Sequence, residues 1–217
     1  MTHWQKISAA LAATALAGWA GLTAPASNAA TTVCGSNCAA LYNLDYGTTD
    51  LLAVAGASGT SASPGQLIWM TQATNTNPGE DWVLNPEGTV ADFYYAGILS
   101  SGLNTHYGSD EVYEYQYAPN GTATGYCLGV AVTNASGYSS VALEPCGVNN
   151  KTLWIFDVAD QYHRDIPLIT GTDTNFSYPY VLTGDTLGTF LHTKQITGGN
   201  GIINTGQYWA TIYGPLP

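Results

Sequence analysis

The chain has 217 residues and a formal net charge of −11, because fifteen acidic residues stand against four basic ones. Such a charge repels phosphate backbones and anionic membranes, so we expect neither a nucleic acid partner nor insertion into a membrane. Only 9% of the residues are charged, which leaves hydroxyl and amide groups to keep the protein soluble and suits neutral hydrogen-bonding ligands.

Residues 1–29 have the pattern of a secretory signal peptide. Lys6 supplies a positive charge, residues 7–22 are apolar or small, and the segment ends in a small-x-small cleavage site at residues 27–29. A membrane anchor is the alternative, but the Ala, Gly and Thr content disfavours it. We therefore expect a secreted, extracellular protein whose residues 30–217 form one domain, and we expect a monomer.

The four cysteines indicate disulfide bonds, because they are even in number in a chain predicted to be exported. Four cysteines allow three pairings, and proximity favours Cys34 with Cys38 and Cys127 with Cys146. Zinc is the alternative for Cys34 and Cys38. No second pair of Cys or His residues has matching ligand spacing, so we expect no metal and no other cofactor.

Short β-rich runs separated by Gly, Pro, Asn and Thr predict an all-β domain, because helical periodicity is nearly absent. The runs cover residues 66–70, 92–95, 112–117, 141–143 and 208–213. Three segments share one order of motifs, and they close on Trp82, Trp154 and Trp209. This repetition favours a barrel built from one module used three times.

The middle segment begins with Cys-Leu-Gly-Val at Cys127, and the third closes on Gln207 and Trp209. These motifs resemble the ricin B-type lectin family, whose repeats carry Cys-Leu-Asp-Val and a closing Gln-x-Trp. The resemblance covers residues 41–213. It implies a β-trefoil of three internal repeats, with the closing tryptophans in the core, and it favours a disulfide between Cys127 and Cys146.

The spacing of the closing tryptophans is unequal, because Trp82 and Trp154 lie further apart than Trp154 and Trp209. We therefore predict an inserted loop or hairpin between repeats one and two, within residues 93–109. Long excursions from a compact β scaffold either carry function or cover one end of the barrel.

The family resemblance also implies a sugar site in each repeat. Such sites hold sugar hydroxyls with an Asp just after Cys-Leu, stack the ring on an aromatic residue and use polar residues near the closing Gln. The Asp is missing here, since Ala53 takes its place in the first repeat, Gly129 in the second, and Thr183 or Gly184 in the third.

The first repeat keeps most of the remaining sugar-binding residues. Trp69 stands at the stacking position, and Asp50 precedes it as a substitute for the missing carboxylate. The predicted carbohydrate-binding residues are Asp50, Gln66, Trp69, Asn77 and Glu80. The alternative is that Trp69 packs beneath a neighbouring loop. In the second repeat Glu144 occupies the stacking position, so we interpret that copy as structural.

We therefore predict a secreted, non-catalytic carbohydrate-binding module for a neutral extracellular glycan or polysaccharide. The alternative is a degenerate β-trefoil that binds a protein or acts as an inhibitor scaffold through the aromatic segment 93–117. An enzyme is a third hypothesis, for which Asp110, Glu111 and Glu114 would supply paired carboxylates. A solvated acidic strand accounts for them better, and no serine lies in a Gly-x-Ser-x-Gly motif.

Overall fold

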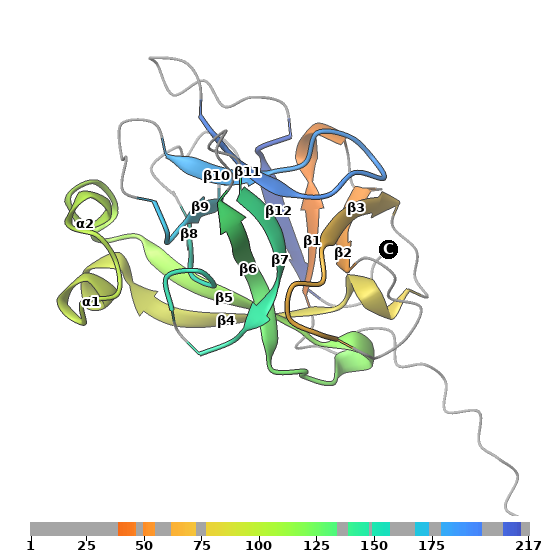
Figure 1. The fold of residues 1–217 in the computed structure, drawn as a ribbon, viewed down its shortest axis with the longest axis horizontal. Coiled ribbons are helices and arrows are strands. Elements are labelled where there is room, and N and C mark those ends of the chain that lie inside the picture. Colours follow the sequence, from red (N-terminus) through yellow and green to blue (C-terminus); the bar gives the residue numbers. More distant parts are fainter. Residues whose placement is uncertain are drawn as a thin grey trace, which may run out of the picture. The chain divides into compact units, whose positions relative to one another are not determined.

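A computed structural model describes residues 39–46, 50–54, 62–72, 77–133, 139–147, 149–156, 168–173, 179–196 and 206–213. Within these ranges the chain is mostly β-structure (Figure 1). The strands are β1 Ala39–Asn43, β2 Asp50–Val54, β3 Ile68–Gln72, β4 Trp82–Thr89, β5 Glu111–Tyr117, β6 Tyr126–Thr133, β7 Ser139–Pro145, β8 Trp154–Phe156, β9 Leu168–Thr170, β10 Tyr180–Thr183, β11 His192–Gln195 and β12 Trp209–Tyr213. The helices are α1 Val90–Tyr95 and α2 Ser101–Tyr107, with single 3-10 turns η1 Leu44–Tyr46, η2 Pro78–Glu80 and η3 Pro119–Gly121.

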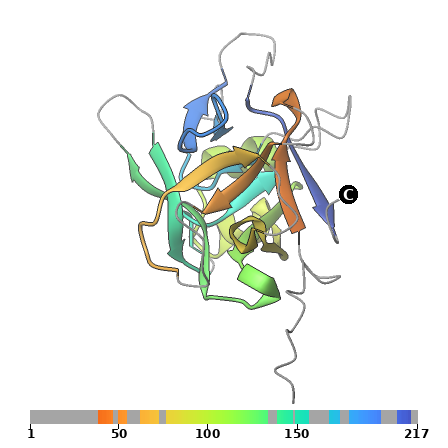
Figure 2. The same cartoon turned by 90° about the vertical axis from the view of Figure 1, so that its right-hand side faces the viewer.

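The strands form one antiparallel network. Pairing joins β12 to β1, β1 to β4, β4 to β5, β5 to β8, and β8 to β9. The other strands form the hairpins β2–β3, β6–β7 and β10–β11, and each hairpin pairs with the strand that precedes it. Figure 2 looks onto the β2–β3 hairpin in orange, with β6–β7 in green and β10–β11 in blue next to it.

The three closing tryptophans lie in the main core, as predicted. Trp82 and Trp154 are 0% exposed and Trp209 is 1% exposed. The indole N–H of Trp154 donates to the carbonyl oxygen of Leu128, and that of Trp209 donates to the carbonyl oxygen of Leu182, both over 2.9 Å. A buried indole N–H needs such a partner, so these bonds fix each ring against the first strand of a hairpin.

A second apolar cluster lies outside the main core. Along β8 the side chains alternate, so Trp154 joins the main core while Ile155 joins the second cluster. Phe93 of α1 and Leu103 of α2 pack in this second cluster, and Val112 of β5 lies there too. The strands are therefore covered on both faces in this part of the molecule.

Residues 93–109, for which the sequence predicts a loop or hairpin, contain the second half of α1 and all of α2, between β4 and β5. The prediction of a β-rich run at residues 92–95 is wrong, because these residues belong to α1. The helix begins with a capping box in which Thr89 and Asp92 each bond the other's backbone N–H. This local bonding outweighs the β propensity of two consecutive tyrosines.

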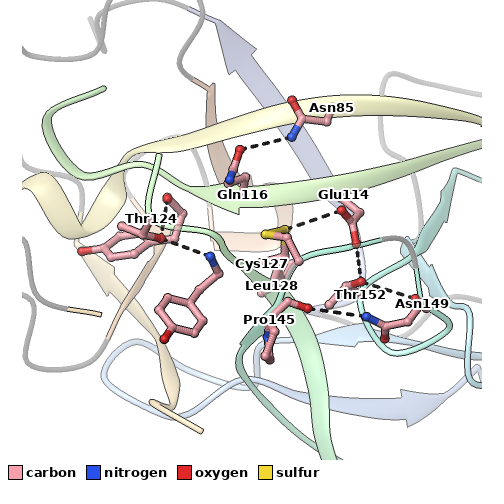
Figure 3. The surroundings of a disulfide bond; sticks show 12 residues. Asn85, Glu114, Gln116, Thr124, Cys127, Leu128, Pro145, Asn149 and Thr152 are labelled. Atoms are coloured by element: carbon pink, nitrogen blue, oxygen red, sulfur yellow. Dashed lines mark hydrogen bonds between the residues drawn. A yellow bond between two sulfur atoms is a disulfide. The ribbon is translucent and has the colours of Figure 1, made fainter. Parts of the chain in front are cut away.

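The predicted disulfide between Cys127 and Cys146 is confirmed. Their Cα atoms lie 5.0 Å apart, and the bond ties the start of β6 to the residue that follows β7. Figure 3 shows the buried Glu114 beside it, with Oε2 3.8 Å from the Sγ of Cys127 and with the hydroxyl of Thr152 donating to Oε1. Glu114 therefore lies against a disulfide and not against a metal-binding thiolate.

Other predictions lie outside the described residues. These are the signal peptide at residues 1–29 and the pairing of Cys34 with Cys38. Among the residues that the structure does describe, no helix is both long and apolar enough to cross a membrane.

Candidate functional site

Trp69 is the predicted stacking residue, and it lies on the outer face of β3. Its neighbours Ile68 and Met70 are fully buried in the main core. Because side chains alternate along a strand, the Trp69 ring is directed away from that core, where it is half-buried. Its indole N–H is buried and has no hydrogen-bond partner in the described part of the chain. The indole N–H of Trp69 is therefore not available to a ligand at the surface, which leaves the apolar part of the ring.

Phe190 lies against Trp69. The two ring centroids are 4.0 Å apart at an interplanar angle of 52°, and an isolated bridge pairs the two residues. Phe190 is 43% exposed, so the pair forms an aromatic surface that reaches solvent. We call Trp69 and Phe190 the aromatic site. The alternative that Trp69 packs beneath a neighbouring loop describes part of this arrangement, because Phe190 belongs to the turn before β11 and its ring lies against Trp69.

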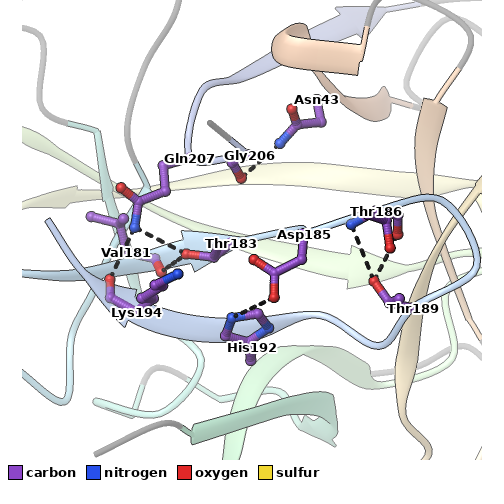
Figure 4. Close-up of polar contacts among 10 residues, drawn as sticks. All are labelled: Asn43, Val181, Thr183, Asp185, Thr186, Thr189, His192, Lys194, Gly206 and Gln207. Atoms are coloured by element: carbon purple, nitrogen blue, oxygen red, sulfur yellow. Dashed lines mark hydrogen bonds and ion pairs between the residues drawn. The ribbon is translucent and has the colours of Figure 1, made fainter. Parts of the chain in front are cut away.

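Backbone bonds from a distant turn bring Phe190 to this place. The edge of β3 that does not pair with β2 bonds the chain around Thr189, with Met70 N donating to Thr189 O over 3.0 Å and Gly188 N donating to Met70 O over 2.7 Å. Leu191 N then donates to Ile68 O over 2.8 Å. The turn is closed by the Thr189 hydroxyl, which donates to the carbonyl oxygen of Thr186 over 2.7 Å (Figure 4).

A polar pair flanks Phe190 in the chain. His192 Nε2 lies 3.6 Å from Asp185 Oδ2, and the Asp185 side chain is 55% exposed (Figure 4). His192 is two residues after Phe190 at the start of β11, and Asp185 precedes the same turn. Donor and acceptor groups therefore occupy the chain segment that carries half of the aromatic site.

The other predicted residues are held by local structure. The Gln66 side chain folds back, with its Oε1 accepting from Ser63 N over 3.4 Å. The Asn77 side chain caps η2 by accepting from Gly79 N over 2.9 Å. Glu80 is 2% exposed, which leaves little of it for a ligand. Asn77 and Glu80 lie near the first hairpin, since η2 contacts β2.

Asp50 is the first residue of β2. In the β2–β3 ladder it is paired with Gln72, whereas Trp69 is paired with Ala53. Because Asp50 and Ala53 are three positions apart in β2, the register places the positions of Asp50 and Trp69 on opposite faces of the β2–β3 ladder. The part of Asp50, Gln66, Asn77 and Glu80 in binding stays a prediction.

At two of the positions where the related sugar sites carry an Asp, neighbouring atoms leave no room for a Cβ. A Cβ at Gly129 would lie 2.9 Å from Cβ and Cγ of Glu144, and a Cβ at Gly184 would lie 2.8 Å from Sδ of Met70. Real Cβ atoms essentially never approach other heavy atoms so closely, so an Asp at either position would displace its neighbour. Both positions are therefore sterically crowded in this chain.

Gln207, the literal Gln of the closing Gln-x-Trp, has a structural role. It is 0% exposed, and its Nε2 donates to the Thr183 hydroxyl over 3.2 Å and to the Lys194 carbonyl oxygen over 3.3 Å. Thr183 and Lys194 belong to β10 and β11 (Figure 4). The side chain therefore ties the β10–β11 hairpin to the start of β12.

No protein-family model and no curated protein matches the sequence. Solved structures do match its fold. A designed threefold symmetric protein, ThreeFoil, superposes with a TM-score of 0.52 at 14% identity over 81% of this chain and 98% of its own. A lectin of Polyporus squamosus, solved with a human-type influenza-binding epitope, gives 0.52 at 13% identity over 82% of this chain. The chain has a β-trefoil fold.

A mosquitocidal holotoxin also matches, with a TM-score of 0.53 at 11% identity over 84% of this chain. The chain spans 18% of that toxin and 49% of the Polyporus squamosus lectin. The β-trefoil thus occurs within longer proteins of other kinds. At these identities the comparisons establish the fold, while the ligand has to be argued from the aromatic site.

Proposed function

We propose that this protein is a secreted, non-catalytic carbohydrate-binding module that stacks a neutral glycan on the aromatic site. The observation that carries the proposal is the contact between the exposed ring of Phe190 and the half-buried ring of Trp69. A pyranose ring has one apolar face of C–H groups, and an aromatic ring buries that face while leaving the hydroxyls at the edge.

The surrounding chemistry supports a neutral ligand. The Asp185–His192 pair supplies an acceptor and a donor close in the chain to Phe190, and few charged groups compete for water or ions. The bidentate Asp of the related sugar sites is absent, so hydroxyl orientation rests on single hydrogen bonds. We therefore expect weak affinity from a single site that combines the first hairpin with the turn after β10.

We also propose that the β-trefoil consists of three structural repeats. Two observations support the three repeats. Each of the three hairpins pairs with the strand that precedes it, and the indole N–H groups of Trp154 and Trp209 each donate to a carbonyl oxygen of a hairpin. The helical segment between β4 and β5 would then be an insertion after the first repeat. A neutral extracellular polysaccharide, bound by a monomer after export, fits the predicted signal peptide at residues 1–29.

Titration calorimetry against a panel of neutral polysaccharides tests the proposal. We expect Trp69→Ala and Phe190→Ala each to weaken binding by about tenfold, in line with the loss of one stacking ring. Tyr95→Ala is the matched control, because Tyr95 is 81% exposed on α1 and lies outside the aromatic site. Binding that survives both ring deletions, or that is absent for every neutral glycan at millimolar sugar, would refute the proposal.

A protein-binding role is the second candidate. Tyr95 is the most exposed of the large hydrophobic residues that the structure describes, at 81%, and its ring lies 5.2 Å from that of Tyr94. Exposed tyrosines provide large contact area at low entropic cost. Tyr94→Ala with Tyr95→Ala would abolish a protein interaction and leave glycan binding unchanged, so the two functions separate in one experiment.

A further inference from the structure

A cavity lies among the paired strands, and neither residue of the aromatic site lines it. Its volume is about 420 Å³, and its walls come from β1, β4, β5, β8, β9 and β12. None of the described residues that line it belongs to the three hairpins. The cavity and the aromatic site therefore share no element, since Trp69 belongs to the first hairpin and Phe190 lies two residues before β11.

One wall of this cavity is a stack of three rings. Phe156 of β8 is stacked with two tyrosines of β5, with ring centroids 4.2 Å from Tyr113 at 28° and 6.1 Å from Tyr115 at 26°. Tyr113 and Tyr115 are two residues apart, so the strand presents both on one face. The arrangement offers flat, nearly parallel apolar surfaces.

Two of the tyrosine hydroxyls on the lining already have hydrogen-bond partners. The Tyr115 hydroxyl shares a hydrogen bond of 3.2 Å with the Thr211 hydroxyl, and the Tyr113 hydroxyl donates to Glu111. The described lining contains no Lys, Arg, His, Asp or Glu. A ligand rich in hydroxyls would find few free partners, and an ionised ligand would find no opposite charge, so both classes would lose hydration without compensation.

The cavity is deep but reachable. Trp209 and Leu168 on its lining are each 1% exposed, whereas Leu84, Tyr113 and Phe156 are half-buried and form its accessible side. Protein cores are close-packed and leave few voids larger than a water molecule. A volume of about 420 Å³ instead falls within the range of small-molecule pockets, which are mostly apolar and aromatic.

We propose that this cavity binds a neutral, largely apolar small molecule. A flat ring of this molecule packs against the rings of Tyr113, Tyr115 and Phe156. This binding is separate from the glycan proposal and does not depend on it. The ring stack selects flat ligands, and the absence of charged groups in the described lining selects neutral ones.

The neutral fluorophore N-phenyl-1-naphthylamine tests this proposal on the whole purified protein. We expect a saturable rise in its fluorescence. Thr211→Trp should weaken binding by about tenfold or more because it fills the cavity, and Tyr113→Leu should weaken it because it removes one ring of the stack. Trp69→Ala should leave probe affinity unchanged, since Trp69 lies outside the cavity.

Three results would overturn the proposal. They are the absence of saturable probe binding, full retention of binding in both folded cavity variants, and loss of binding in Trp69→Ala, which would place the probe on the aromatic site. Thermal unfolding of each variant verifies its fold. Tyr113→Leu changes a half-buried side chain, so it keeps the test decisive if Thr211→Trp fails to fold. A glycan that binds the aromatic site should not displace the probe.

Discussion

Gly206 has a backbone φ of +87°, and a Cβ at this position would lie 2.1 Å from the carbonyl oxygen of Gly184. Any other residue at this position would therefore destabilise the fold in two ways, through the left-handed backbone conformation and through the clash of its Cβ with the Gly184 carbonyl. The carbonyl oxygen of Gly206 also accepts two hydrogen bonds, from Asn43 Nδ2 over 2.8 Å and from Gly184 N over 3.0 Å. It joins the first described strand to the third hairpin.

We predict that Gly206→Ala strongly lowers the free energy of unfolding. Gly125→Ala is the matched control, because Gly125 has a φ of +78° with open space where a Cβ would be. The control should lose about 1–2 kcal/mol for the left-handed conformation alone. Urea unfolding should show a clearly larger loss for Gly206→Ala, and equal losses in the two variants would contradict the collision.

Glu87 gives a prediction about pH. Partial burial, and then the charge of Glu114, raise the pKa of the Glu87 carboxyl above its ordinary value. The folded state therefore binds this proton more tightly than the unfolded state does, so stability is lost as pH rises through the folded pKa. We predict that Glu87→Gln raises the urea midpoint at neutral pH and that the gain disappears below about pH 4, where both states are protonated.

Asp92 is the control with the opposite sign. Hydrogen bonds from the backbone and side chain of Thr89 lower the pKa of the Asp92 carboxyl. Its contribution to stability is therefore present at neutral pH and is lost as pH falls through the folded pKa. Asp92→Asn should lower the urea midpoint at neutral pH, with a deficit that shrinks in acid. The same sign for both variants would be inconsistent with these two environments.

At the scale of elements, the Cys127–Cys146 disulfide clamps the β6–β7 hairpin at its open end. We predict that replacing both cysteines with serine lowers the free energy of unfolding by about 2–4 kcal/mol, because the unfolded chain regains the freedom of that loop. Glycan affinity should stay unchanged, since the aromatic site uses β3 and the turn before β11. Loss of affinity without loss of fold would show that the middle hairpin takes part in binding.

The sequence predicts the strands around the closing tryptophans but not the helices α1 and α2. The strands with closing tryptophans were predictable, because an apolar run around a Trp recurs three times and each ring is buried. The two helices were not, because α1 depends on a capping box formed by Thr89 and Asp92 and on burial of Phe93 against distant strands. Helices this short gain their stability from tertiary packing, which no local pattern reveals.

At the scale of the whole molecule, the candidate site was only half predictable. Trp69 follows from its place in a motif, but Phe190 does not, because backbone bonds between β3 and the turn around Thr189 bring the two together. The β-trefoil makes such contacts between hairpins that are far apart in sequence. A binding surface that spans two hairpins therefore has no continuous sequence signature.

The charge of the whole chain gives the last prediction. With a net charge of −11, the molecule repels polyanions, and a site built from aromatic faces gains nothing from an ionic ligand. Affinity for a neutral glycan should therefore change little between about 0.1 and 1 M salt, whereas that range shortens the Debye length from about 10 to 3 Å. Calorimetry in both buffers, with heparin and duplex DNA as polyanionic competitors, measures this. A steep loss of glycan affinity in high salt, or competition by either polyanion, would mean that a local positive patch governs recognition and that stacking on Trp69 and Phe190 does not.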